Sequence, residues 1–179
     1  MLKKVKVFLG IGMVISIIVL SYQLVEANTK IQSYKEKEVS AFSFAILNYS
    51  NVLSSIAMTL ADYNEDFTEG ERVLYERLLS SHGYRLNHIG RELTSLRQLY
   101  PEDLIYEQYV YFIEHLLFHT KRNFPESRRH EIGEVILEYS DQIRIFSFDT
   151  KKLLSNDIEM RRLLDLISAM NEDVSKFVY

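Results

Sequence analysis

The sequence lacks cysteine and tryptophan, and it has only two prolines and six glycines among 179 residues. Without cysteine there can be no disulfide, no thiolate metal ligand and no cysteine nucleophile. Secreted eukaryotic domains often depend on disulfides, so their absence favours a bacterial protein. The scarcity of glycine also excludes glycine-rich phosphate and dinucleotide loops. Scarce glycine and proline together leave little room for turns.

Neither positive nor negative charge dominates the chain. It has 21 basic and 25 acidic residues, a net charge of −4. Residues 1–27 carry three lysines and one glutamate, so residues 28–179 keep 18 basic and 24 acidic residues, a net charge of −6. Binding to phosphate backbones requires a basic surface. We therefore expect no nucleic-acid partner.

A long hydrophobic run follows three lysines at the start of the chain. No charged residue occurs between Val7 and Val25, and a run of this length suits a membrane-spanning helix, which needs about 20 apolar residues. Basic residues before the run favour a cytoplasmic N-terminus. We predict a signal-anchor or transmembrane segment over residues 1–27, with contact to the membrane through residues 7–25, and an extracytoplasmic domain over residues 28–179.

The same segment also has features of a cleaved signal peptide. Val25-Glu26-Ala27 fits the small-residue pattern that precedes a cleavage site. Cleavage after Ala27 would release a secreted helical protein that binds a ligand or partner. However, no glycine or proline occurs from Met13 to Glu69, whereas signal peptides usually lose helical structure before the cut. Retention as an anchor is therefore the favoured interpretation.

Five segments repeat apolar residues every three or four positions, which is the period of an α-helix. The segments are Val39–Leu60, Tyr75–Tyr100, Ile105–His119, Ile132–Leu153 and Met160–Phe177. No segment shows the sustained alternation of a strand. Short connections favour antiparallel neighbours. The sequence therefore predicts an all-α fold, with an N-terminal membrane-spanning helix followed by an elongated antiparallel bundle of four or five helices.

Local signals mark where two of these helices begin. Thr68 and Glu71 form a capping-box pattern, and Asn156 and Glu159 would cap the last helix in the same way. The weak point is Gly83, which could divide the second helix in two, but the apolar repeat continues through it and favours one helix, straight or bent.

The helix count then predicts how the two long loops are placed. Two helices separate the acidic loop at residues 62–71 from the basic loop at residues 121–129. Two antiparallel helices return the chain to the end where it started. We therefore expect both loops at the same end of the bundle, away from the membrane.

Histidine and acidic residues offer two metal-ligand patterns. His115 and His119 are four residues apart on a predicted helix, a spacing that can hold zinc. No glutamate lies three residues before any histidine, which excludes the di-iron pattern of helical bundles. Asp62, Asn64 and Asp66 alternate like calcium ligands, but phenylalanine and valine replace the required glycine and glutamate. A metal-binding bundle enzyme is thus a third hypothesis, and the main expectation is no cofactor and no catalysis.

The basic loop provides the candidate residues for binding a partner, namely Lys121, Arg122, Arg128 and Arg129. Their simplest role is loose neutralisation of the acidic loop, with each exposed pair worth about 0–1 kcal/mol. The alternative is a docking tip for another protein. Since no catalytic motif is present, the sequence predicts a membrane-anchored binding or scaffold module that acts through a protein partner, and a homo-oligomer is compatible with it.

Overall fold

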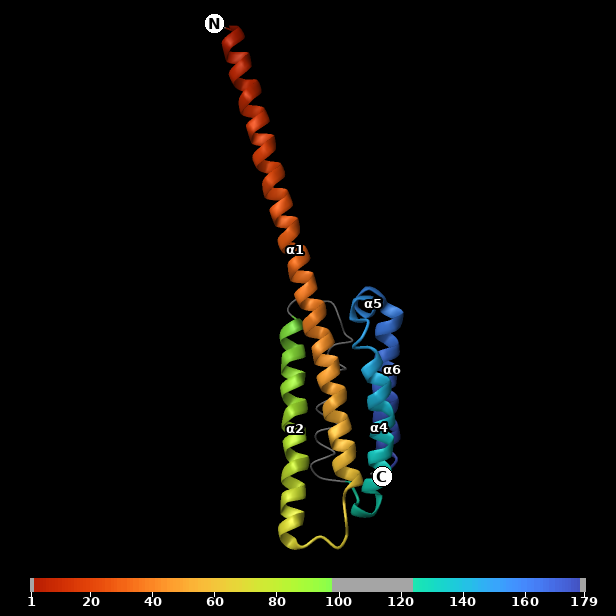
Figure 1. The fold of residues 1–179 in the computed structure, drawn as a ribbon. Helices are drawn as coiled ribbons and strands as arrows, with labels where there is room; N and C mark the ends of the chain where they lie inside the picture. The colour runs from red at the N-terminus through yellow and green to blue at the C-terminus, as the bar shows by residue number, and fades with distance from the viewer. Residues whose placement is uncertain (1, 98–123, 178–179) are drawn as a thin grey trace. The chain divides into compact units, whose positions relative to one another are not determined.

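The computed structural model describes residues 2–97 and 124–177, and every regular element among them is a helix (Figure 1). The elements are α1 (Leu2–Ala61), α2 (Glu69–Arg97), the short 3₁₀ helix η1 (Glu126–Arg128), α4 (Arg129–Ile145), α5 (Thr150–Ser155) and α6 (Asp157–Ser175). The predicted all-α class is confirmed. The predicted stripe Ile105–His119 lies outside the described residues. The chain divides into two units, residues 1–38 and residues 39–179.

In the first unit, the described side chains of α1 do not pack against another helix. Every residue from Gly12 to Lys37 is exposed, and Met13 and Leu24 reach 72% and 73% exposure. The helix continues through the candidate cleavage site, since the Thr29 hydroxyl donates to the Val25 carbonyl at 2.9 Å. This helix is long and apolar enough to cross a membrane.

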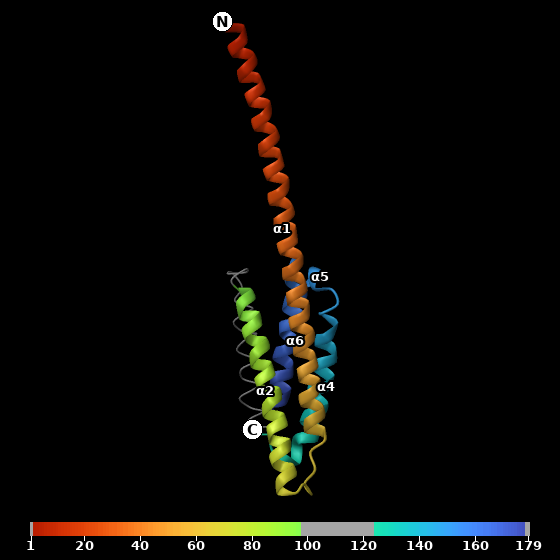
Figure 2. The same cartoon turned by 60° about the vertical axis from the view of Figure 1, so that its left-hand side comes forward.

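In the second unit, the later part of α1 lies side by side with α2, α4 and α6 (Figures 1 and 2). The four helices share one hydrophobic core. Residues of α1 from the predicted stripe lie at its centre: Ile46, Tyr49, Leu53, Ile56 and Leu60 are at most 1% exposed. Full burial of each such side chain contributes about 1.5–3 kcal/mol. The three-four repeat therefore identified the core face of α1 correctly.

The contact of α1 with α4 and with the turn that follows α4 is built from small residues, which we call the small-residue seam. Its facing pairs are Ser43 with Ser147, Ser50 with Ser140, and Ala57 with Gly133. Each step along the seam moves seven residues forward on one helix and seven back on the other, so the two helices run antiparallel. The serine hydroxyls of α1 donate to the facing carbonyls of residues 147 and 140 at 2.6 and 2.8 Å.

The predicted start of α2 is confirmed in detail. The Thr68 amide donates to the Glu71 carboxylate at 2.8 Å, and the Glu71 amide points back to the Thr68 hydroxyl at 3.4 Å. The helix then continues through Gly83 without a break. Asn156 caps α6, accepting from the Ile158 amide. Glu159 was expected to complete this cap but does not, because its carboxylate pairs with Lys152 and Arg162.

The fourth stripe, expected as one helix from Ile132 to Leu153, is interrupted. Helix α4 ends at Ile145, and α5 begins at Thr150. Between them the amides of residues 146, 147 and 148 bond to the carbonyls three residues back, which tightens the chain into turns. Asp149 then caps α5 by accepting from the Lys152 amide. The apolar spacing did not reveal this break because Leu153, after the break, is buried in the core at the position that an uninterrupted repeat would give it.

Candidate functional site

The predicted acidic and basic loops meet, as far as the described residues show. Arg129 at the start of α4 pairs with Glu76 of α2 at 2.9 Å, and the His130 ring lies 3.3 Å from the Ala61 carbonyl. Helix α2 is unbroken, so these contacts confirm the expected return of the chain to the same end of the second unit.

Arg129 lies at the centre of an aromatic cluster at this end. Its guanidinium carbon is 4.4 Å from the ring centre of Tyr63 and 5.1 Å from that of Tyr75. Phe67 completes the cluster, with ring centres 5.8 Å from Tyr63 and 5.9 Å from Tyr75. Cation–π contacts of this kind strengthen when they are desolvated, and Arg129 is only 9% exposed. Burial also raises the pKa of the Tyr75 hydroxyl to about 12.

This geometry gives the two described arginines different roles. Arg129 is held inside the fold and presents little surface to a partner. Arg128 lies at the surface, where it pairs with Glu131 at 2.8 Å and stacks 4.8 Å from the Phe177 ring centre. Lys121 and Arg122 lie outside the described residues. Among the residues predicted for partner binding, the structure therefore places only Arg128 on the described surface.

The metal-ligand candidates are only partly described. The exposed residues Asp62, Asn64 and Asp66 form a turn, in which the Asn64 side chain accepts from the Asp66 amide at 3.0 Å. Within residues 2–97 and 124–177, no group of three or more histidine or acidic side chains is arranged to hold a metal ion. His115 and His119 lie outside these ranges.

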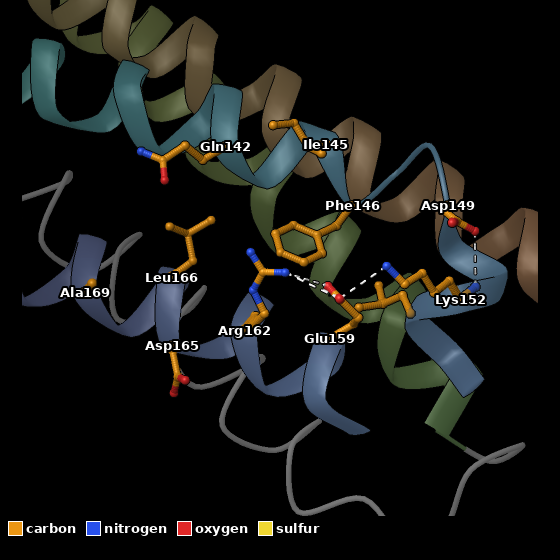
Figure 3. A pocket seen from close by; sticks show the side chains of 11 residues that line it. Gln142, Ile145, Phe146, Asp149, Lys152, Glu159, Arg162, Asp165, Leu166 and Ala169 are labelled. Carbon is orange, nitrogen blue, oxygen red and sulfur yellow. Dashed lines mark hydrogen bonds and ion pairs between the residues drawn. The ribbon is translucent and has the colours of Figure 1, made fainter. Parts of the chain in front are cut away.

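A groove between α4, α5 and α6 has a volume of about 620 Å³ (Figure 3). Phe146, directly after α4, and Leu166 of α6 point into it, and Ile145, Leu153 and Ala169 extend the apolar lining. At one end the Glu159 carboxylate lies 3.3 Å from Lys152 and 3.1 Å from Arg162. The ion pairs occupy the charged groups at this end, so the groove offers mainly apolar contact.

Sequence reasoning missed the small-residue seam and the groove. A signal for the seam is present, because Gly133, Ser140 and Ser147 are spaced by seven, as are Ser43, Ser50 and Ala57. No comparable signal marks the groove, since it depends on the break between α4 and α5. Comparisons with protein-family models, curated proteins and solved structures found no match for this chain.

Proposed function

We propose that the protein is a membrane-anchored, extracytoplasmic binding or scaffold module, an antiparallel helical bundle that acts through a protein partner. The proposal is supported by the difference in exposure between two parts of α1. Its side chains from Gly12 to Lys37 are all exposed, and its residues from Ala45 to Leu60 supply the centre of the core. An apolar helix with no protein partner is suited to lipid, where its backbone bonds are all satisfied internally.

The course of α1 also supports retention of the anchor over release. The segment around Ala27 is helical, and the Glu26 carboxylate pairs with Lys30 one turn later at 2.8 Å. A cleavage site requires an accessible backbone at this point. The basic residues before Val7 support an extracytoplasmic position for the bulk of the chain.

The test is to express the full chain with a C-terminal tag in a bacterium and to wash the membranes with carbonate. We expect the protein to stay in the membrane at its uncleaved mass, and to be degraded by protease added outside spheroplasts. A double variant, Ile15→Lys with Ile18→Lys, should abolish membrane retention, because lysine in the centre of a span costs about 2.5–3.5 kcal/mol. The matched control Ile158→Lys changes an exposed residue of α6 and should be retained.

A soluble form that begins at Asn28 would instead establish the secreted protein. Protection from external protease would contradict the extracytoplasmic position while leaving the anchor intact. The two parts of the proposal are therefore tested separately.

A further inference from the structure

A second apolar stripe begins at the end of the apolar run of α1 and continues into the residues that follow it. Leu24, Ala27, Ile31 and Tyr34 are separated by three, four and three residues, the spacing of one helix face that packs against another helix. All four are exposed, with Leu24 at 73%, Ile31 at 52% and Tyr34 at 69%. We call these four residues the linker stripe.

The linker stripe is separate from the apolar stripe of the core. Extending the seven-residue repeat of the core upstream from Val39 and Phe42 leads to Gln32, Lys35 and Asn28, which are all polar. The apolar residues of the linker therefore belong to a different repeat, and the core does not require them.

The charged residues at the positions that flank the linker stripe are all basic. In a heptad with Leu24 and Ile31 at the first position, the flanking positions carry Lys30, Lys35 and Lys37. The acidic residues Glu26 and Glu36 fall on the outer side of the helix, and Glu38, at the next first position, ends the apolar stripe. Flanking positions of this kind determine which helix can pair with which.

We propose that the linker stripe binds an apolar helix of another membrane-anchored protein whose flanking positions carry aspartate or glutamate. The proposal rests on the proposed function, because the anchor is what places this segment at the membrane surface. The flanking lysines would face the acidic residues of the partner, and Leu24, Ile31 and Tyr34 would pack against its apolar positions. The linker would thereby recognise its partner by charge and hold it by apolar contact.

A second copy of this chain is a poorer occupant. In a parallel pair of identical helices, Lys30 of one copy faces Lys35 of the other. Two like charges at facing positions oppose association and select against the wrong partner. The same lysines that attract an acidic helix therefore oppose self-association along this stripe.

A lipid surface is also a poorer occupant. An amphipathic helix that binds lipid head groups lies in the plane of the membrane. Here α1 is one continuous helix from Leu2 to Ala61, and no glycine or proline between Met13 and Glu69 offers a bend. A linker that continues a spanning helix projects away from the membrane, so its stripe faces neighbouring helices.

The present contacts of the lysines do not prevent such binding. Lys30 pairs with Glu26, but the two side chains are 67% and 51% exposed. The Lys37 ammonium lies 5.9 Å from the ring centre of Tyr34. Exposed contacts of both kinds are worth about 1 kcal/mol or less. The linker stripe extends over only roughly 15 Å of helix, so its contact with a partner helix is small. Because both proteins are held in the same membrane, their effective concentration is raised, and this makes a small contact sufficient for binding.

The experiment uses the full chain in vesicles of neutral lipid, with a fluorophore on Ser33→Cys, which is unique because the chain has no other cysteine. The probe is a synthetic helix with its own transmembrane segment, apolar residues at the pairing positions and glutamate at the flanking positions. A matched probe carries lysine at the flanking positions. We expect energy transfer to the glutamate probe at least tenfold stronger than to the lysine probe, and we expect it to fall with added salt.

Two variants and a control make the test specific. The triple change Lys30→Glu, Lys35→Glu and Lys37→Glu should reverse the preference between the probes. Ile31→Ser with Tyr34→Ser should abolish binding to both, whereas Gln32→Ala, on the outer side of the helix, should change nothing.

Equal binding of the two probes, or a preference that does not reverse, would overturn the proposal. Energy transfer between two labelled copies, stronger than transfer to either probe, would assign the stripe to self-association. All variants leave residues 7–25 unchanged, so membrane retention reports on the anchor independently.

Discussion

Gly133 of α4 lies so close to Ala57 of α1 that a methyl group on Gly133 would stand 2.7 Å from the Ala57 carbonyl oxygen. The obstacle is backbone, which cannot move aside without shifting a helix. An alanine here would gain about 1 kcal/mol of helix propensity. It would also overpack the seam, which typically costs about 1–3 kcal/mol. We expect the cost of overpacking to exceed the gain in helix propensity. Gly133→Ala should therefore lower the free energy of unfolding by about 1–2 kcal/mol.

The matched control for this prediction is Gly70→Ala in the first turn of α2, where an added methyl group would meet nothing within 4 Å. It should leave the stability unchanged or raise it by up to about 1 kcal/mol. Thermal unfolding of the full chain in detergent, followed by circular dichroism, measures both. Equal effects of the two substitutions would show that the seam is looser than described.

The hydroxyl contact between Ser54 and Ser140 provides a second prediction. Their oxygens lie 2.9 Å apart, and the two serines are 7% and 0% exposed. A double-mutant cycle with Ser54→Ala and Ser140→Ala should give a coupling energy of about 0.5–1.5 kcal/mol, the usual net value of a buried hydrogen bond. Urea unfolding supplies the four stabilities. A coupling of zero would mean that the contact does not persist in solution.

Arg129→Lys is expected to be destabilising although it keeps the charge. The lysine ammonium cannot spread over the faces of both Tyr63 and Tyr75 while reaching Glu76, because it is a compact charge without the planar fork of arginine. We expect a loss of about 1–3 kcal/mol, as for other buried networks that lose a member. The neighbouring Arg128, whose side chain is 47% exposed, is the control, and Arg128→Lys should change the stability by less than about 0.5 kcal/mol.

Alkaline pH should unfold the second unit. Burial raises the pKa of Tyr75 to about 12, and a hydrogen bond to Asp173 raises that of Tyr139 to about 12. An unfolded tyrosine has a pKa of about 10, so the unfolded state loses its protons first as pH rises. The stabilising effect is complete below pH 10 and is lost progressively between pH 10 and 12. Unfolding temperatures of the wild type should therefore fall over this range.

Tyr75→Phe tests that assignment. Removing one late-ionising hydroxyl should make the unfolding temperature fall less steeply between pH 10 and 12, because one tyrosine contributes up to 1.36 kcal/mol per pH unit. A steeper slope for Tyr75→Phe would contradict the sign of the effect.

The features that sequence reasoning identified are those set by neighbouring residues. Thr68 and Glu71 form a capping box with each other, so three residues of sequence contain the whole interaction. The core face of α1 was likewise visible as a repeat of large apolar residues. Gly83 did not break α2, as expected, because the apolar residues on both sides of it, Leu79 and Leu86, remain buried in the same core.

The features that were missed depend on residues far apart in the chain. Arg129 looked like one of several surface cations, and it is buried only because Tyr63, Phe67 and Tyr75 come from other segments. The break at residues 146–149 was hidden because Leu153 continued the repeat. The small residues of the seam were missed because the helices were predicted from the spacing of large apolar residues. They nevertheless determine how closely α1 and α4 approach each other.

The small-residue seam also sets an order of events during synthesis. Ser43 and Ser147 are 104 residues apart in the chain, and Ser50 and Ser140 are 90 apart. At about 5–20 residues per second, α1 emerges several seconds before the helix that closes against it. During that interval α2 has already been made, but the part of the α1 face that α4 covers is still open to other chains. We therefore expect the yield of this protein to depend on chaperones that shield this face until α4 has been made.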